Sequence, residues 1–582
     1  MTNASTPAAG AFTFVLHGHL PYVLTHGKWP HGSDMVFECA AESYLPLLRV
    51  FDRLVSEGIS PKVTLGITPI LAEQLADPDF KAQFVGYLDD RIRVAGENRE
   101  QFTKEKQPHL ADLAAMWRAH FLTIRDDFRD MYGSDLIGGF RRLQDGGHIE
   151  IITSAATHGY LPLIGRDEAI QAQVKQAVKS YQRHFGRAPR GFWLPECAYR
   201  PRYAWASPLP DSGPQQPVLR KGVEEFLADS DIEYFIVDTA TLLGGAAVGV
   251  YMDRFPGLQR LWERFRASYR PGEVDIERSP YEAYLISSAI EDRPPVAVFT
   301  RDERTGIQVW SGEHGYPGDG WYLDFHKKHI PGNHRYWRVT SPQSGLDSKE
   351  PYQPARAAER VPENADHFCA LVDELLSSHH ARTGSYGILC APYDAELFGH
   401  WWFEGPEWLY QVLKGVNSNP AVDMVTCSEY LDAHTPETAV SLPESSWGQG
   451  GFHWIWLNEW TAWIWKHIYS DEAEMPALAE LAAQSDGELT GILQQAAREL
   501  MLLEASDWPF LISTWTARDY AERRAAFHHE AFSRLADMAR RKVRGDGLTS
   551  EDETFLADCR ARDAIFPDID LDWWRRVERP AE

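Results

Sequence analysis

Short apolar runs that end in charged or polar side chains restrict the fold of this chain more than any other feature. The run over residues 191–194 leads into Glu196, and the run over residues 386–391 leads into Asp394. Residues 12–16 form a third run of this kind, which ends in a pair of histidines. In a barrel of parallel strands, catalytic side chains lie where strands end and loops begin. The pattern therefore predicts a β/α barrel that gathers these residues at one end.

Aromatic residues accompany both carboxylates. Trp193 precedes Glu196 by three positions, and Trp401 and Trp402 follow Asp394 closely. Cleavage of a glycosidic bond uses two carboxyl groups, one as nucleophile or base and the other as acid. Aromatic faces suit the apolar C–H face of a sugar ring. The two segments therefore predict a carbohydrate-active enzyme.

An ordered series of short motifs extends over most of the chain. The series consists of HGHLPY (17–22), ATHGYLP (156–162), WLPE (193–196), VWS (309–311), GYPG (315–318), YDAELFGH (393–400), SWG (446–448), WLNE (456–459) and EASDWPF (504–510). It resembles glycoside hydrolase family 57, and within that family the bacterial α-1,4-glucan branching enzymes. The resemblance implies a retaining enzyme that cleaves an α-1,4-glucan and transfers the freed chain to a 6-hydroxyl, forming an α-1,6 branch.

The fold implied by the resemblance is α/β, a distorted (β/α)7 barrel with a helical insertion and a C-terminal α-helical domain. Strand-like runs occur at residues 12–16, 62–67, 148–153, 191–194, 234–238 and 386–391. The spacing of apolar residues predicts a helix over 44–57 and amphipathic helices from Trp460 to about Arg541. We expect the barrel over residues 1–76 and 144–430, the insertion over 77–143, and the helical domain, which contributes to the glucan cleft, over 431–582.

By match to the family, Glu196 is the nucleophile and Asp394 the general acid/base. Glu196 would attack the anomeric carbon while Asp394 protonates the departing oxygen, and Asp394 would then activate the acceptor. Glu396 competes for the role of acid, because side chains two apart on an extended segment point the same way. Without catalysis, Glu196 would be a carboxylate that caps a helix and Asp394 a turn-forming aspartate.

Three histidines form a second group of candidates. His17 and His19 lie two apart at a strand end, and His158 supplies a third imidazole. Three imidazoles can bind a metal such as zinc. The resemblance instead implies contacts with sugar hydroxyls and support for the nucleophile, with no metal and no cofactor. Neutral imidazole suits hydroxyl recognition because it both donates and accepts.

The resemblance assigns further positions to the glucan site. They are Trp29, Arg301, Trp310, Gly318, His400, Trp447, Trp456 and Asp507. Arg301 would lie near the nucleophile and help keep Glu196 ionised. Trp310 and Trp447 would stack on glucosyl rings. Gly318 would let the backbone approach the sugar closely, as glycine does wherever space is short.

Two of these positions, Trp456 and Asp507, also fit ordinary structural roles. Trp456 is equally well explained by core packing. Asp507 would accept hydrogen bonds from sugar hydroxyls, or it would cap the helix that begins near Trp508.

Tyr251 follows Gly244 and Gly245 by six residues, as does a mobile-loop tyrosine of related branching enzymes. That tyrosine covers the active site and favours transfer over hydrolysis, since a lid can exclude water while admitting a sugar hydroxyl. The stretch after Tyr251 is longer than in close bacterial relatives. The resemblance therefore leaves the geometry of the lid open.

The composition narrows the choice of partner and compartment. The chain carries 84 acidic and 58 basic side chains, a formal charge of −26, and so lacks the basic balance of nucleic-acid or anionic-membrane binding. A neutral α-glucan such as amylose or glycogen suits this charge.

Six scattered cysteines predict reduced thiols, and no signal peptide or membrane-length apolar run is present, so we expect the cytoplasm. The 21 tryptophans exceed what a core needs, and we expect about half of them to be sugar-stacking surface.

Two alternatives remain open at this stage. An α-glucan hydrolase or a 4-α-glucanotransferase could use the same scaffold, and its product would contain no new α-1,6 linkages. A catalytically silent glucan-binding protein is the alternative of a different class, against which the presence of both Glu196 and Asp394 counts.

Overall fold

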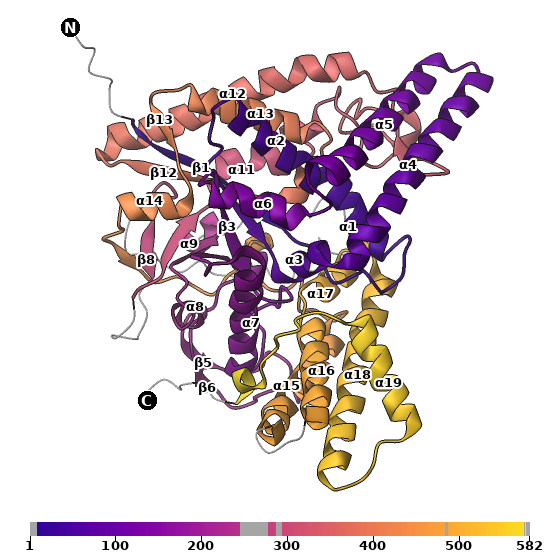
Figure 1. The fold of residues 1–582 in the computed structure, drawn as a ribbon. Coiled ribbons are helices and arrows are strands. Elements are labelled where there is room, and N and C mark those ends of the chain that lie inside the picture. Colours follow the sequence, from indigo (N-terminus) through magenta and orange to yellow (C-terminus); the bar gives the residue numbers. More distant parts are fainter. Residues whose placement is uncertain (1–7, 245–277, 287–293, 483–486, 576, 578–582) are drawn as a thin grey trace.

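The computed structural model describes residues 8–244, 278–286, 294–482, 487–575 and 577. Within these ranges, seven neighbouring strands run parallel around a central barrel (Figure 1). In spatial order they are β12 (Gly387–Asp394), β1 (Gly10–Gly18), β2 (Val63–Ile67), β3 (Ile149–Ser154), β4 (Gly191–Trp193), β7 (Tyr234–Val237) and β9 (Ala297–Thr300). One bridge, between Arg301 just after β9 and Cys390 in β12, joins the two ends of the series. The predicted distorted (β/α)7 barrel is confirmed.

Short strands extend the sheet beside the barrel. Strand β13 (Val422–Met424) pairs with the start of β1. Strand β8 (Tyr284–Ile286) lies antiparallel to β9, and β14 (Ala439–Val440) continues the sheet next to β8. Two hairpins lie outside the sheet, formed by β5 (Tyr203–Trp205) with β6 (Val218–Arg220) and by β10 (Lys328–His329) with β11 (His334–Arg335).

The barrel strands are apolar because both of their faces are covered. All nine residues of β1 are buried, as expected of parallel strands with helices outside and side chains inside. Phe14 on β1 stacks on Phe368 with ring centroids 5.8 Å apart, and its ring meets Trp408 edge-on at 6.0 Å. These contacts hold the strand so that its last residues point into the end of the barrel.

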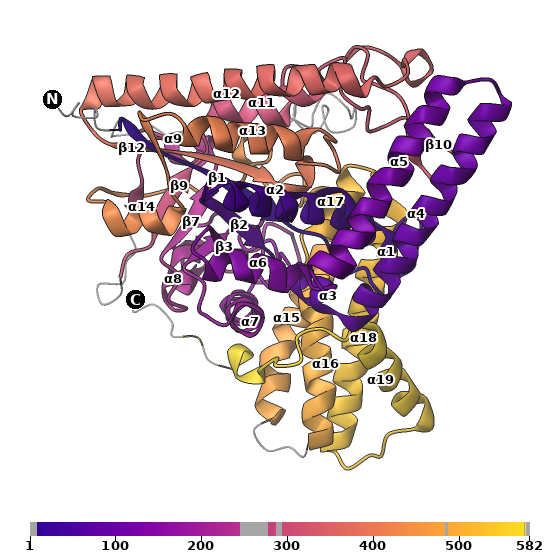
Figure 2. The same ribbon diagram turned by 45° about the horizontal axis from the view of Figure 1, so that its top comes forward.

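Helices alternate with the strands and cover the outside of the barrel (Figures 1 and 2). They are α1 (Ser33–Cys39), α2 (Leu45–Ser56), α3 (Pro69–Ala76), α6 (Leu136–Asp145), α7 (Asp167–Phe185), α8 (Val223–Ala228), α9 (Thr239–Leu243), α11 (Glu303–Trp310), α12 (Pro354–Thr383), α13 (Gly405–Asn417) and α14 (Cys427–Ala433). Helix α12 contains Phe368 and α13 contains Trp408, so both pack directly on β1.

Two long helices leave the barrel in the region predicted to be a helical insertion. Helices α4 (Pro78–Lys104) and α5 (Pro108–Asp126) pack along each other and extend away from the sheet (Figure 1). The side chain of Asp77 caps α4 by accepting the amide N–H of Asp79. Helix α6, which also falls mostly within 77–143, packs instead on α2 and β3. The boundaries proposed for the three parts of the chain remain a prediction.

Helices at the C-terminal end form a separate layer below the barrel in Figure 1. They are α15 (Ala462–Ala482), α16 (Gly487–Leu503), α17 (Asp507–Ser513), α18 (Arg518–Val543) and α19 (Ser550–Arg562). The loop after β3 joins them to the barrel, through a bridge between Gly159 and Ala505 and an N–H of Ser506 donated to the carbonyl of His158 over 3.0 Å. No helix in the described ranges combines the length and apolarity needed to cross a membrane.

Candidate active site

A cavity of about 350 Å³ lies at the carboxyl ends of the barrel strands. The predicted site residues that line it are His17, His19, His158, Glu196, Arg301, Trp310, Asp394, His400, Trp447, Trp456 and Asp507. The strand ends supply the acidic and histidine residues, and the C-terminal part of the chain supplies Asp507 and several aromatic side chains. Segments that are far apart in sequence therefore meet around one enclosed space.

Glu196 follows β4 within a short turn of 3-10 helix, Pro195–Cys197. Its φ of +59° lies in the left-handed region, which costs free energy for a residue with a Cβ atom and recurs at functional sites. Its carboxylate accepts hydrogen bonds from Trp447 Nε1 at 2.8 Å and Ser506 Oγ at 3.0 Å. Burial raises the pKa of Glu196 to about 7, against the lowering effect of these two donors.

Asp394 is the last residue of β12, where it pairs in register with His17. Within the part of the chain that the structure describes, no side chain or amide donates a hydrogen bond to its carboxyl group. Burial raises the pKa of Asp394 well above its usual range, and the charges of Glu396 and Glu196 raise it further. The raised pKa of Asp394 favours its protonated form, and the proton faces the cavity.

Glu396 also lines the cavity, but its carboxylate already has partners. It accepts the amide N–H of His19 over 3.0 Å and the hydroxyl of Tyr44. A carboxylate held in this way orients its neighbours and is poorly placed to transfer a proton to a substrate. These contacts favour Asp394 over Glu396 as the acid, a choice that the sequence left to the resemblance alone.

A chain of hydrogen bonds leads from His17 to Glu196. His17 Nε2 lies 3.1 Å from His158 Nε2, and His158 Nδ1 lies 2.9 Å from Ser506 Oγ, which donates to Glu196. Burial lowers the pKa of both imidazoles well below the usual range. Both rings are therefore neutral. The three hydrogen bonds then all run in one direction: His17 donates to His158, His158 donates to Ser506, and Ser506 donates to the carboxylate of Glu196.

His19 differs from the other two histidines because an acid faces it. Its Nε2 lies 3.0 Å from Asp507 Oδ2. Burial lowers the pKa of His19, but the charge and hydrogen bond of Asp507, together with the charges of Glu196 and Glu396, outweigh burial and raise the pKa overall. Asp507 is the first residue of α17, where Ser506 occupies the N-cap position, so the alternative of a helix-capping aspartate is wrong.

We expect Ser506→Ala to shift the acidic limb of the kcat/KM profile upward by about one pH unit, because a hydrogen bond that stabilises the Glu196 carboxylate is lost. A profile of kcat/KM against pH measures this shift. Ser180→Ala is the matched control. Ser180 is buried on the distant helix α7 and donates a hydrogen bond to the Glu73 carboxylate over 2.7 Å. Equal profiles for Ser506→Ala and Ser180→Ala would contradict the assignment.

Arg301 lines the cavity, and its ion-pair partner is not Glu196. Its guanidinium forms an ion pair with Asp238, directly after β7. Burial raises the pKa of Asp394, and the charge of Arg301 opposes that rise. Among the charged neighbours with the largest effects on the pKa of Glu196 are Asp507, which raises it, and His19, which lowers it. The expected role of Arg301, keeping Glu196 ionised, is therefore not supported by its contacts.

Two predicted site residues in the described ranges, Trp29 and Gly318, are not brought into this cavity. Trp29 is 66% exposed and lines a separate small cavity, which shares Glu38 with the main one. Gly318 is buried outside the cavity, and a Cβ there would lie 2.3 Å from the carbonyl oxygen of Gly312. Gly318 therefore accommodates neighbouring backbone and not a sugar. Tyr251 lies outside the described residues.

Aromatic side chains form much of the wall. Trp310, Trp401, Trp447, Trp454 and Trp456 line the cavity, a smaller share of the 21 tryptophans than the half expected from sequence. Trp456 also stacks on Tyr160 with centroids 4.5 Å apart and is 1% exposed, so it serves both core and cavity.

Sequence reasoning overlooked several residues that line the cavity or contact its catalytic candidates. The most informative of these are Ser506, Trp454 and Phe510. Ser506 and Phe510 lie in the same motif as Asp507, and Trp454 lies two residues before Trp456. The motifs marked the right segments, but only a three-dimensional structure shows which side chains of a segment face the cavity.

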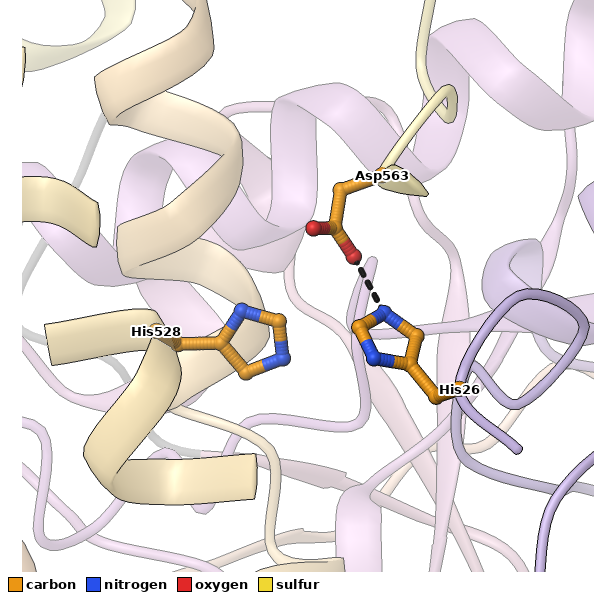
Figure 3. Close-up of side chains that lie close together, drawn as sticks. All are labelled: His26, His528 and Asp563. Carbon is orange, nitrogen blue, oxygen red and sulfur yellow. Dashed lines mark hydrogen bonds and ion pairs between the residues drawn. The ribbon is translucent and has the colours of Figure 1, made fainter. Parts of the chain in front are cut away.

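Among the described residues, the groups best placed to hold a metal do not include His17, His19 or His158. His26, His528 and Asp563 meet where the chain after β1 contacts the C-terminal helices, with His26 Nε2 2.6 Å from Asp563 Oδ1 (Figure 3). However, His528 Nδ1 lies 2.7 Å from a carboxylate oxygen of Glu499, and its Nε2 accepts from Arg524 over 3.1 Å. An arginine that occupies a ligand nitrogen repels a cation, so this cluster is a polar contact between the two parts of the chain.

The second cluster of potential ligands, Glu38, Glu42 and His400, borders the main cavity. Arg335 lies 3.1 Å from a carboxylate oxygen of Glu42, and Lys328 lies 3.3 Å from Glu38. His400 Nδ1 lies 2.9 Å from Glu42. These cations already neutralise the carboxylates, and His400 is oriented by Glu42.

Fold and site together define a class: an enzyme that acts on glycosidic bonds by means of two carboxyl groups in an aromatic cavity. Residues 13–443 match the model of glycosyl hydrolase family 57, and residues 467–574 match the model described as 1,4-alpha-glucan branching enzyme, C-terminal. The chain belongs to glycosyl hydrolase family 57.

Several characterised proteins resemble the whole chain. A 1,4-alpha-glucan branching enzyme of Thermococcus kodakarensis is 42% identical over 561 residues, which are 96% of this chain and 77% of the relative. The structure of a family 57 branching enzyme from Pyrococcus horikoshii superposes with a TM-score of 0.86 at 40% identity, covering 98% of both chains. The α-amylase AmyC of Thermotoga maritima superposes with a TM-score of 0.78 at 29% identity, covering 98% of this chain and 100% of its own.

Proposed function

We propose that this protein is a retaining 1,4-α-glucan branching enzyme. The observation that carries the proposal is the pairing of Glu196 with Asp394 in one enclosed cavity, in a chain that resembles branching enzymes over nearly its full length. The match of residues 467–574 to the C-terminal model of branching enzymes supports the same conclusion.

Glu196 would serve as the nucleophile. Hydrogen bonds from Trp447 and Ser506 favour its anion and hold its oxygens in place. The carboxylate would attack C1 of a glucosyl unit, so that the C1–O4′ bond breaks as a glycosyl ester forms. The covalent intermediate would keep the transferred chain on the enzyme while the first product leaves.

Asp394 would move the proton in both steps. Its raised pKa keeps a proton available for the departing 4-oxygen. As a carboxylate, it would then accept the proton of an incoming 6-hydroxyl, whose oxygen attacks C1 and releases Glu196. The two inversions at C1 leave an α-linkage, now to O6.

We expect a bell-shaped dependence of kcat/KM on pH. Glu196 must be ionised, so activity falls as the pH drops through its pKa of about 7. Asp394 must be protonated, so activity falls again as the pH rises through its elevated pKa. Initial rates of branching on amylose between pH 5 and pH 10, measured at constant ionic strength, would show both limbs. A rate that rises steadily toward low pH would contradict these roles.

A hydrolase is the second candidate, because the amylase of Thermotoga maritima shares the fold at 29% identity. The acceptor decides between the two: a sugar hydroxyl gives a branch, and water gives a reducing end. Purified protein would be incubated with amylose, and proton NMR would count α-1,4 and α-1,6 linkages against new reducing ends. New α-1,6 linkages with few reducing ends support branching, and reducing ends alone indicate a hydrolase.

We also propose amylose-like or glycogen-like chains as substrate and the cytoplasm as compartment. The uncharged glucan suits a chain of formal charge −26, since no electrostatic term opposes binding. All six cysteines are free thiols, which accords with a reducing compartment. Glycogen content of a strain lacking this protein would test the physiological assignment.

A further inference from the structure

Two tryptophans on the C-terminal side of the molecule have no part in the site described above. Trp515 is 58% exposed, and Trp460 is partly buried beside it. Their ring centroids lie 6.0 Å apart with planes at 85°, so the two indoles form a corner. Neither side chain lines the catalytic cavity.

The corner lies on two segments that also line the cavity. Trp460 lies four residues after Trp456, in the loop before α15, and Trp515 directly follows Thr514 after the end of α17. Trp456 and Thr514 both line the cavity, as does Phe510 of α17. The two segments that build this side of the cavity therefore also carry the exposed indoles.

Asn458 fixes the two segments to each other. Its Nδ2 donates to the carbonyl of Trp454 and to Ser513 Oγ, each over 2.8 Å. Its Oδ1 accepts the amide N–H of Trp460 over 2.9 Å. One side chain therefore sets the position of the Trp460 loop against the end of α17.

The backbone of Trp515 is unusual for an exposed aromatic residue. Its φ of +60° lies in the left-handed region, which bulky side chains rarely adopt. The guanidinium of Arg518 lies 4.7 Å from the ring centroid and restricts how the indole can turn. A strained residue whose side chain is mostly in solvent gains little from packing, and such residues are concentrated at functional sites.

We propose that Trp460 and Trp515 form an outer binding site for the α-1,4-glucan chain that leads out of the catalytic cavity. The proposal rests on the function proposed above and adds that the protein binds long glucan chains more tightly than short ones. Each indole face matches the C–H face of a glucosyl unit. An α-1,4-linked chain curves, so successive units turn relative to one another, and two perpendicular indoles suit such a chain. Because a glucan is uncharged, the acidic surface does not oppose it.

Binding would be measured by calorimetry in a Glu196→Gln background, where no turnover occurs. We expect Trp460→Ala/Trp515→Ala to weaken amylose binding about tenfold, the loss of roughly one good aromatic contact. Binding of maltotriose, which is short enough to stay in the cavity, should not change. This readout is independent of the reaction: if the active enzyme made only reducing ends, the branching proposal would fail while the outer site could still be tested.

Two further variants keep the test decisive. Trp321→Ala is the matched control, because Trp321 is a half-buried indole covered by Arg338 at 4.3 Å and lines neither cavity. Trp515→Gly relieves the left-handed backbone, so its Tm should equal or exceed that of the parent while its amylose affinity falls. The proposal is overturned if the double variant binds amylose as tightly as its parent, if Trp321→Ala weakens binding equally, or if Trp515→Gly lowers Tm without weakening binding.

Discussion

Replacing Glu196 with glutamine is expected to lower kcat/KM on amylose by at least about ten-thousandfold, because the nucleophile of a covalent mechanism is removed. Glutamine has nearly the same size, and its amide oxygen can still accept from Trp447 Nε1 while its NH2 group donates to Ser506 Oγ. The fold and glucan binding should therefore persist. Initial rates by iodine staining, with Tm and amylose affinity measured alongside, separate lost chemistry from lost structure.

A smaller replacement gives a sharper test of the same role. Glu196→Gly leaves a space beside C1, and azide can enter it and attack C1 while Asp394 protonates the leaving oxygen. One inversion then gives a β-glycosyl azide, whereas retention would give the α-anomer. An α-azide product, or a Glu196→Gln enzyme that keeps more than about a tenth of its activity, would exclude Glu196 as nucleophile.

The second large effect is expected for Asp394→Asn. The amide cannot donate a proton to the departing 4-oxygen, and kcat/KM on amylose should fall by at least about a thousandfold. A maltooligosyl α-fluoride loses fluoride without that proton, so its first step should remain fast. The base needed for the second step is also missing, so the glycosyl-enzyme should accumulate. Mass spectrometry of the intact protein would detect the added sugar.

Glu396→Gln is the matched comparison, because Glu396 lines the same cavity but is engaged by His19 and Tyr44. We expect it to lose activity on amylose and on the fluoride alike, with no trapped intermediate, since its effect would be to disturb its neighbours. Accumulation of the intermediate in Glu396→Gln but not in Asp394→Asn would reverse the assignment of the acid.

The sequence was most informative where side-chain periodicity and strand ends coincide. The predicted strands near residues 12–16 and 386–391 correspond to β1 and β12, and their last residues line the cavity. Both strands are buried on two faces, so they appear in sequence as unbroken apolar runs. Strand β9, Ala297–Thr300, was overlooked because it follows a long connection without a clear pattern, whereas β7, of the same length, was predicted.

Details of the site depend on contacts that no local pattern encodes. The family match gave Glu196, but the donor Ser506 lies 310 positions away in sequence. Arg301 illustrates the opposite case: the motif placed it in the cavity, and only the structure reveals that Asp238 holds its guanidinium. Gly318 shows a further limit: a glycine in a motif does not say which atoms approach it, and here the carbonyl oxygen of Gly312 does.

The position of Ser506 and Asp507 has a consequence for when this protein can work. Synthesis delivers the complete barrel, with Glu196 and Asp394, long before α17 leaves the ribosome. Until α17 docks against the loop after β3, Glu196 lacks one of its two hydrogen-bond donors and His19 lacks its acidic partner. The nascent barrel therefore contains Glu196 and Asp394 without the contacts from Ser506 and Asp507 that influence the protonation of Glu196 and His19. Activity is tied to completion of the chain, and proteolytic fragments that retain only the barrel are expected to leave glucan intact.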